Sequence, residues 1–157
     1  MRHLRPGRLG FGTALAVALA AAGTLAMAPA ATVTPGTATL SFDCGWYGSG
    51  SATLTATEKG TTGTISLATK AISSPIPIGA NSVTSTLTLT KNGSGTTQFK
   101  GSANPAIPAG GEVSTGPLTG TVAPGDSLAA TSLKVVVLGI TATCKATTPQ
   151  SPGPFVF

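Results

Sequence analysis

The stretch Val83–Thr90, which reads VTSTLTLT, decides the fold class of this chain. Threonine occupies every second position, and the positions between hold valine, serine and leucine. Because residues i and i+2 of a β-strand lie on the same face, one face of this segment is threonine and the other is mostly aliphatic. β-Branched side chains also favour the pleated geometry of a sheet. The pattern therefore predicts a strand with an inner aliphatic face and an outer threonine face.

The same alternation recurs on both sides of this strand. Residues 51–57 (SATLTAT) place threonines opposite alanine and leucine, and shorter runs of this kind occupy 37–43, 62–68, 96–102 and 118–122. The longest run is 132–145, with Leu133, Val135 and Val137 on one face and Val136, Leu138 and Ile140 on the other. Apolar residues on both faces are typical of a central strand. We therefore expect one long, doubly buried strand over 132–145.

Turn residues separate these runs. Asn92-Gly93 lies between two strand-like segments and predicts a hairpin. The Pro-interrupted segments 73–80 (SSPIPIGA) and 104–111 (NPAIPAGG) are expected to form loops or edge strands. About seven short strands with regular turns predict an all-β protein, a single antiparallel β-sandwich of immunoglobulin-like type.

The first thirty residues have the order of a secretory signal peptide. Three arginines precede the uncharged run FGTALAVALAAAGTLAMA at 11–28, and Ala28-Pro29-Ala30 fits the small-residue cleavage pattern. The run is too rich in alanine, glycine and threonine for a strongly apolar membrane span. We expect a cleaved signal peptide at 1–30, a linker at 31–36, the sandwich domain at 37–146 and a Pro-rich tail at 147–157. The mature protein is then secreted, loosely associated with the cell surface at most, and without a membrane span.

Charge excludes several classes of partner. Charged residues make up 8% of the chain, where about a quarter is usual. The net charge of +5 includes the three arginines of the predicted signal peptide, so that the mature chain keeps six scattered lysines, four acidic residues and a net charge of +2. A nucleic-acid binder usually carries a clustered basic stripe with arginine. We therefore expect no nucleic-acid partner. Too few aromatic residues remain for the two girdles of an outer-membrane barrel.

Cys44 and Cys144 are the only cysteines. Export places them in an oxidising compartment, where such a pair usually forms a disulfide. A redox pair or a metal site is the alternative, but CxxC spacing is absent and the only histidine, His3, lies in the predicted signal peptide. We expect a disulfide, no metal and no cofactor. The bond should place the first and last strands side by side, or face to face across the core.

Catalytic groups are sparse in the mature chain. Without histidine it cannot build a Ser-His-Asp or Cys-His site. Ser132 and Lys134 are two residues apart on one predicted strand face, a spacing that is usually incidental. The four carboxylates, Asp43, Glu58, Glu112 and Asp126, fall in separate predicted turns and strand ends. We expect no catalytic residues and no enzyme, with a carboxylate-dependent hydrolase as a distant alternative.

Two surface segments are candidates for binding. The segment 44–50 (CGWYGSG) holds the only tryptophan and tyrosine, Trp46 and Tyr47. Either Trp46 packs over the disulfide and plugs one end of the sandwich, with Tyr47 half exposed, or the two rings bind a sugar or a protein. The Pro-rich loop Ser74–Gly79 is the second candidate, for a protein partner. Cell-wall polysaccharide and another secreted protein are the partners that these features suggest.

Short motifs carry a resemblance to a known group of proteins. They are SFDCGW at 41–46, PIP at 75–77, AIPAG at 106–110, GPLTG at 116–120, APGD at 123–126 and TATC at 141–144. This layout, over about Thr37–Lys145, resembles small secreted β-sandwich domains of high-GC Gram-positive bacteria, which are uncharacterised exported or cell-surface proteins. The resemblance implies export and an immunoglobulin-like fold, and it assigns no catalytic residue. No LPxTG-like sorting signal is visible, so covalent attachment to the wall is not expected.

These observations lead to one functional expectation and one alternative. We expect a secreted, non-enzymatic β-sandwich that acts as a binding or structural module at or outside the cell surface. The alternative is a secreted inhibitor or protein-interaction module that presents the loop Ser74–Gly79.

Overall fold

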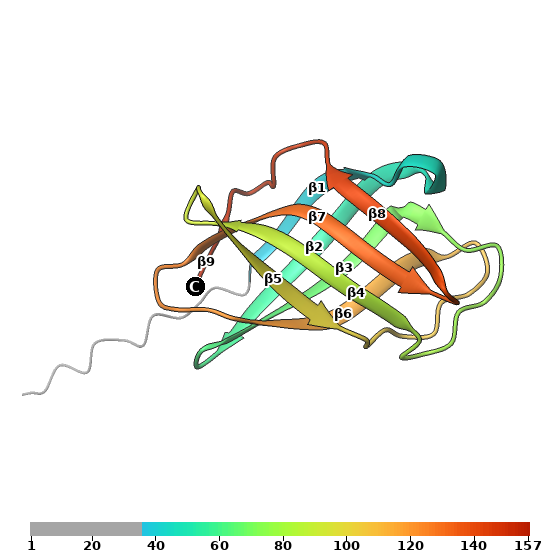
Figure 1. Cartoon of the computed structure of the whole chain (residues 1–157), viewed down its shortest axis with the longest axis horizontal. Helices are drawn as coiled ribbons and strands as arrows, with labels where there is room; N and C mark the ends of the chain where they lie inside the picture. The colour runs from blue at the N-terminus through green and yellow to red at the C-terminus, as the bar shows by residue number, and fades with distance from the viewer. Residues whose placement is uncertain (1–35) are drawn as a thin grey trace, which may run out of the picture. The chain divides into compact units, whose positions relative to one another are not determined.

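A computed structural model describes residues 36–157 as nine β-strands and one short 3-10 helix (Figure 1). The predicted signal peptide, and all of the predicted linker except Gly36, lie outside the described residues. In chain order the elements are β1 (Gly36–Asp43), η1 (Gly45–Tyr47), β2 (Ser49–Lys59), β3 (Thr62–Ser73), β4 (Val83–Lys91), β5 (Gly95–Gly101), β6 (Glu112–Thr121), β7 (Ser127–Val137), β8 (Ile140–Ala146) and β9 (Phe155–Val156). Within residues 36–157 no helix is long and apolar enough to cross a membrane.

The sheet closes on itself. Its order is β4-β5-β6-β3-β2-β1-β8-β7, and β7 pairs again with β4 from Val83–Val137 to Lys91–Leu128. Eight antiparallel strands therefore form a barrel. β9 pairs with the beginning of β7, at Ser127 and Leu128, which β8 does not reach. The all-β class is confirmed, but the predicted immunoglobulin-like β-sandwich is wrong. Inward and outward residues alternate in both architectures, so the alternation could not tell a closed sheet from two stacked ones.

The barrel interior is filled with side chains. Phe42 and Phe99 are fully buried among leucines, isoleucines and valines from the strands, as expected for a barrel of this strand number. Polar residues on the inner face are paired: the Thr115 hydroxyl donates to Ser85 Oγ at 2.7 Å. The outer face carries the threonines, with Thr53, Thr55 and Thr57 all exposed. The predicted division into an aliphatic inner face and a threonine outer face is confirmed.

The prediction of one long strand at 132–145 is wrong. The chain reverses at Leu138-Gly139, so β7 and β8 form a hairpin with Val137 paired to Ile140. Both turn residues have positive φ, 51° at Leu138 and 76° at Gly139, which is the geometry of a two-residue type I′ turn. The second apolar face is not buried, because Leu138 and Ile140 are exposed and Val136 is half-buried. The turn at Asn92-Gly93 does form the predicted hairpin, between β4 and β5.

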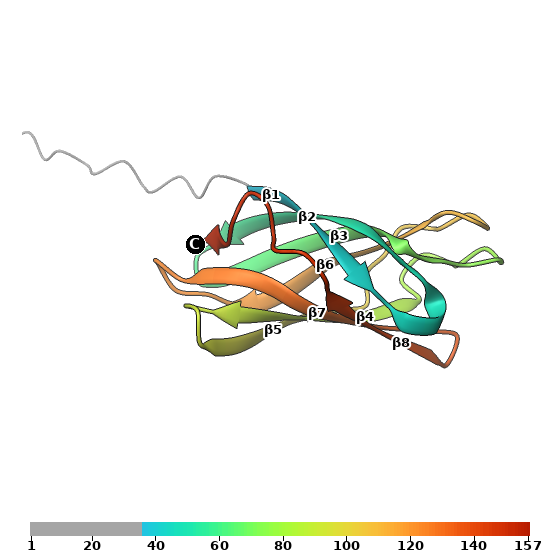
Figure 2. The same cartoon turned by 90° about the horizontal axis from the view of Figure 1, so that it is seen from above.

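Residues 147–157 complete the wall where β1 and β8 separate (Figure 2). β1 and β8 share only two registered pairs, Phe42–Ala146 and Asp43–Lys145. Beyond them the tail runs along β1, where Ser151 and Thr39 exchange backbone hydrogen bonds of 2.7 and 2.8 Å. It then crosses to β7, where β9 pairs Phe155 with Leu128. Since Phe155 and Phe157 are buried, the folded unit continues past the predicted boundary at 146 to Phe157.

Candidate functional site

One end of the barrel gathers four of its chain connections. They are residues 45–48 between β1 and β2, 74–82 between β3 and β4, 102–111 between β5 and β6, and 138–139 between β7 and β8. Because the paired strands are antiparallel, these alternate connections meet at the same end, the right-hand end in Figure 1. We call these four segments together the apolar end.

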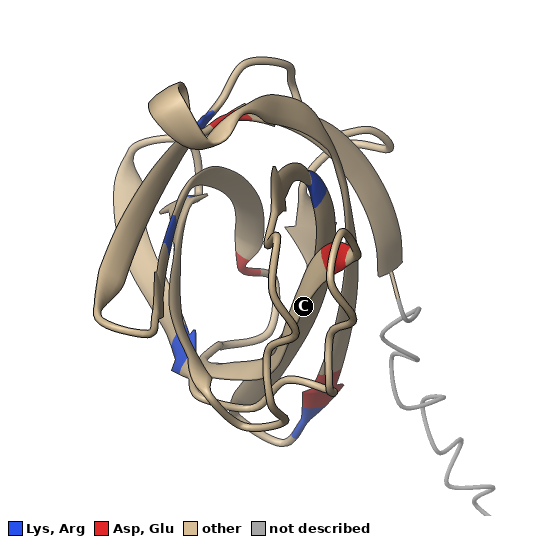
Figure 3. Cartoon of the chain, turned by 90° about the vertical axis from the view of Figure 1, so that its right-hand side faces the viewer, with Lys and Arg blue, Asp and Glu red and all other residues tan. Residues whose placement is uncertain are grey.

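None of the residues in these four segments is charged. Figure 3 looks onto this end, and the connections that face the viewer carry neither charge colour. The opposite end differs, and we call it the charged end. Glu58 and Lys59 precede its β2–β3 turn, Lys91 precedes its β4–β5 turn, and Asp126 lies in its β6–β7 turn. A charge is costly to remove from water unless it is paired. Removing water from the apolar end therefore costs less free energy than removing it from the opposite end.

A cavity of about 200 Å³ lies at the apolar end, between the loop after β3 and the β7–β8 hairpin. Its polar groups are few: the hydroxyls of Ser73, Ser74 and Tyr47 are the only polar side-chain groups in the lining. The remaining lining is Ile72, Pro75, Ile76, Ile78, Val113, Val135, Val137, Leu138, Ile140 and Ala142. The deep residues, among them Val113 and Val135, are buried, whereas Ile76 and Leu138 at the rim are 51% and 64% exposed.

The loops around this cavity are fastened to one another. Asn104 in the β5–β6 loop accepts hydrogen bonds at its Oδ1 from the backbone N–H groups of Ser82 and Val83, at 2.8 and 2.9 Å. Its amide donates to the carbonyls of Gly79 and Pro105. Ile78 and Ile107 exchange two backbone hydrogen bonds between the same loops. The cavity is thus preformed, which lowers the entropy lost when a partner binds.

Leu138 stands in an unfavourable backbone conformation. Its φ of 51° is in the left-handed region, where a side chain other than glycine, asparagine or aspartate costs about 1–2 kcal/mol. Type I′ turns usually hold asparagine or glycine at this position. The leucine side chain gains no compensating burial, because it is 64% exposed. Residues retained in strained conformations cluster at functional sites, and this one presents an apolar group at a hairpin tip.

The segment around η1 holds Trp46 away from the barrel. Asp43 Oδ1 accepts a hydrogen bond of 2.8 Å from Gly45 N–H, and Cys44 N–H donates to the Gly48 carbonyl. A Cβ at Gly48 would approach the Ala71 carbonyl oxygen to 2.9 Å, so this backbone lies directly on β3. Trp46 is 99% exposed, and the predicted plug over the disulfide is wrong.

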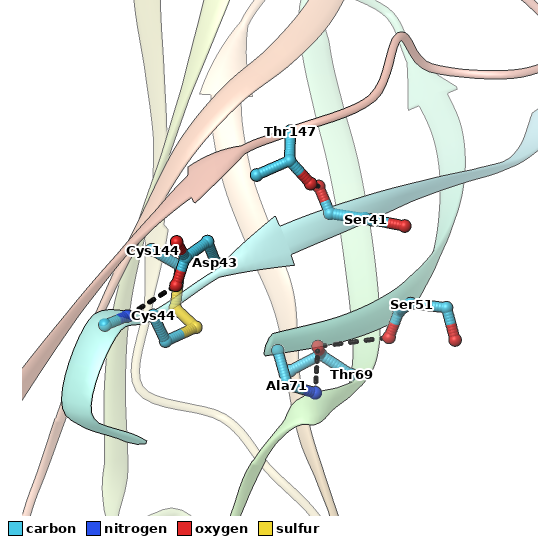
Figure 4. The surroundings of a disulfide bond; sticks show 9 residues. Ser41, Asp43, Cys44, Ser51, Thr69, Ala71, Cys144 and Thr147 are labelled. Carbon is cyan, nitrogen blue, oxygen red and sulfur yellow. Dashed lines mark hydrogen bonds between the residues drawn. A yellow bond between two sulfur atoms is a disulfide. The ribbon is translucent and has the colours of Figure 1, made fainter. Parts of the chain in front are cut away.

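The predicted disulfide between Cys44 and Cys144 is present (Figure 4). Cys44 follows Asp43 and Cys144 precedes Lys145, so in the antiparallel register the two cysteines stand opposite each other, next to the Asp43–Lys145 pair. Their Cα–Cα distance is 3.9 Å, and the first and last long strands lie side by side. Close by, the buried Thr69 hydroxyl donates to the Ser51 carbonyl and accepts from Ala71 N–H, as the dashed lines in Figure 4 show. The base of the η1 segment is therefore rigid.

The structure brings some of the predicted binding residues together. Tyr47 and the Pro-rich loop Ser74–Gly79 both line the cavity, whereas Trp46 lies outside its lining. Sequence reasoning missed Leu138, Ile140 and Val113. For Leu138 and Ile140 the signal was the apolar residues on both faces of 132–145 with Gly139 among them, which marks an exposed hairpin end here rather than a buried strand. Nothing in the sequence around Val113 indicated its place in the cavity lining.

The predicted carboxylates remain separate. Asp43 caps Gly45, Glu112 pairs with Lys70 at 3.3 Å, and Asp126 pairs with Lys91 at 2.9 Å at the opposite end. None of them lines the cavity. Among residues 36–157 no three histidine, cysteine or acidic side chains are grouped as metal ligands would be.

The environment of Asp126 changes the pKa of its carboxyl group. The hydrogen bond from the Lys91 ammonium, followed by the one from Ala123 N–H, lowers the pKa of this carboxyl below its usual value. Asn92 also donates to it, at 3.2 Å. The backbone of Asp126 accepts from Phe157 N–H at 3.0 Å, so this residue joins two turns and the tail at the charged end.

Comparisons of this chain with protein-family models, with curated proteins and with solved structures found no match. Function is therefore inferred from the geometry of the site.

Proposed function

We propose that this protein is an extracellular, non-enzymatic binding module whose apolar end holds a nonpolar group of its partner. The observation that carries the proposal is the cavity of about 200 Å³ with an uncharged lining and an exposed aliphatic rim. Elsewhere the strands present threonine and serine to water. A preformed, mostly apolar cavity with a few polar groups is the usual form of a ligand site, and a local apolar patch on a polar surface marks an interaction site.

Two further features support this assignment. The Cys44–Cys144 disulfide is compatible with an extracellular location. The hydroxyls of Ser73, Ser74 and Tyr47 have no base or carboxylate beside them in the cavity lining, and a hydroxyl is a weak nucleophile without such a partner. The lining therefore suits binding better than covalent chemistry.

Titration with a neutral, environment-sensitive dye such as Nile red tests the proposal. We expect saturable binding, and we expect Ile76→Ser and Leu138→Asn each to weaken it about tenfold, the effect of losing roughly 1.4 kcal/mol of apolar contact. Val156→Ser is the matched control, because Val156 is equally exposed but belongs to β9 at the other end. Binding that does not saturate, or that Val156→Ser reduces as much as Leu138→Asn, contradicts the proposal.

The Pro-rich loop favours a second candidate, a secreted inhibitor or protein-interaction module. Ile76 stands between Pro75 and Pro77, and Ser74 Oγ donates to its carbonyl at 2.8 Å, which holds the isoleucine in an exposed position. Incubation with the proteins of the culture medium tests this candidate. A single protein retained by wild type and lost with Ile76→Ser supports it, whereas equal retention by both variants argues against it.

A further inference from the structure

Apart from Val156, the large hydrophobic side chains that are exposed within residues 36–157 stand on or beside separate loops of the apolar end. Trp46 comes from the η1 segment, Ile76 from the β3–β4 loop, and Leu138 and Ile140 from the β7–β8 hairpin. Each lies in or next to a connection and not in the middle of a strand. Three separate connections therefore project large apolar groups from the same end.

Part of the backbone of these connections is hydrogen-bonded within the loops or lacks a donor. Pro75 and Pro77 lack an N–H, Ile76 N–H donates to Ser74 Oγ at 3.4 Å, and Ile78 N–H donates to the Ile107 carbonyl at 2.9 Å. In the η1 segment, Gly45, Tyr47 and Gly48 all donate to oxygens of their own segment or of Asp43. An unpaired backbone donor costs several kcal/mol in hydrocarbon. The prolines and the paired donors avoid that cost.

Charged groups begin only where the strands begin. Asp43 is the last residue of β1 and Glu112 the first of β6, while Lys70 lies three residues before the end of β3 and pairs with Glu112. Both partners of this pair are well exposed, at 68% and 49% of their side chains. Exposed charged side chains therefore lie at the strand ends, directly next to the uncharged loops of the apolar end. The apolar end itself carries Trp46 and Tyr47, the two residue types enriched at the interface between membrane and water.

We infer that the apolar end is a membrane-docking tip whose partner is the surface of a phospholipid bilayer. Trp46, Ile76 and Leu138 enter the interfacial region, and the cavity receives part of an acyl chain, while the barrel stays in water. This inference rests on the proposed function, because it names the partner of the same surface.

Apolar insertion, not charge attraction, drives this docking. The apolar end holds no cationic side chain, and peripheral proteins that bind through charge use clustered lysine and arginine near the surface. Binding should therefore occur on uncharged vesicles and persist in salt that screens surface charges.

Flotation with phosphatidylcholine vesicles, together with the emission of Trp46, tests this inference. Trp46 is the only tryptophan of the chain, so its emission reports directly on the tip. We expect the mature protein to float with the vesicles, its emission to move to shorter wavelength, and both effects to persist at about 1 M NaCl, where the Debye length is roughly 3 Å. Leu138→Asn should reduce vesicle affinity about tenfold, and Val156→Ser should leave it unchanged.

The possible failures are distinguishable. If vesicles do not bind but Nile red still binds in the cavity, the membrane inference is overturned and the proposed function stands. If neither binds, both are overturned. Vesicle binding that disappears in salt, or that Val156→Ser reduces as strongly as Leu138→Asn, also overturns the inference, because charge or the opposite end would then be responsible.

Discussion

Cys44 and Cys144 occupy the cross-strand position directly after the Asp43–Lys145 pair, so the disulfide extends a β1–β8 seam that has only two registered pairs. The bond closes a loop with a sequence separation of 100. In the chain-entropy model such a closure stabilises the folded state by about 4–5 kcal/mol. We expect replacement of both cysteines by serine to lower the free energy of unfolding by about that amount in urea titrations. A loss below about 1 kcal/mol would show that the tail closes this seam by itself.

A buried amide side chain, that of Gln150, helps to hold the tail on β7. Gln150 Oε1 accepts a hydrogen bond of 3.0 Å from Ala130 N–H in β7, and its Nε2 donates to the Gly153 carbonyl. Gln150→Ala leaves the buried Ala130 N–H unpaired, which should cost about 1–3 kcal/mol of folding stability. Ser151→Ala is the control, because Ser151 is exposed and contacts β1 through its backbone. Equal midpoints of thermal unfolding for these two variants would contradict the anchoring role of Gln150.

Acid should weaken the charged end through Asp126. The hydrogen bonds from Lys91 and from Ala123 N–H lower its pKa in the folded state, whereas in the unfolded chain the pKa is about 3.9. The stabilisation is therefore complete above the unfolded value and is lost as the pH falls through the lower folded value. Denaturant titrations of Asp126→Asn from neutral pH into this acid window should show a weaker fall in stability than wild type.

The matched control for Asp126 is Glu58→Gln. It removes a carboxylate at the same end that forms no salt bridge within residues 36–157. This variant should retain the acid dependence of wild type. Identical pH profiles for wild type and Asp126→Asn would contradict the assignment.

Leu138 is the position where stability and binding should change in opposite directions. Asparagine tolerates the left-handed conformation that Leu138 adopts at φ 51°. Leu138→Asn should raise the free energy of unfolding by about 0.5–1 kcal/mol and reduce dye and vesicle binding. Gly139→Ala, at φ 76°, should instead destabilise the turn by about 1 kcal/mol. A Leu138→Asn variant that is less stable than wild type and binds dye and vesicles equally well would contradict the proposal that the strained backbone of Leu138 serves binding.

Outside 132–145, the sequence places the long strands and their buried faces, because alternation is a local property. Threonines at 84, 86, 88 and 90 identify the outer face of β4 without knowledge of its neighbours. Barrel closure is different, since it depends on β4 meeting β7 and β3 meeting β6, which are pairings between distant segments. No local pattern encodes them.

The errors in the predicted site have a common physical origin. The sequence pattern predicts burial for Val136, Leu138 and Ile140 because apolar residues are usually inside. One of the two alternatives for Trp46, the plug over the disulfide, rests on the same rule. The structure exposes Trp46, Leu138 and Ile140 at one end of the barrel. Burial rules describe the average residue, so they predict such exposed apolar groups wrongly, and under the proposed function these groups form the binding end.

The most direct test of the apolar end as the binding end is a map of backbone amide chemical shifts during titration with the neutral dye. We predict shifts concentrated in residues 45–48, 74–78 and 138–140, with little change at 58–61, 91–95 and 122–126, the turns of the charged end. Shifts confined to the charged end, or spread evenly over the barrel, would contradict the account.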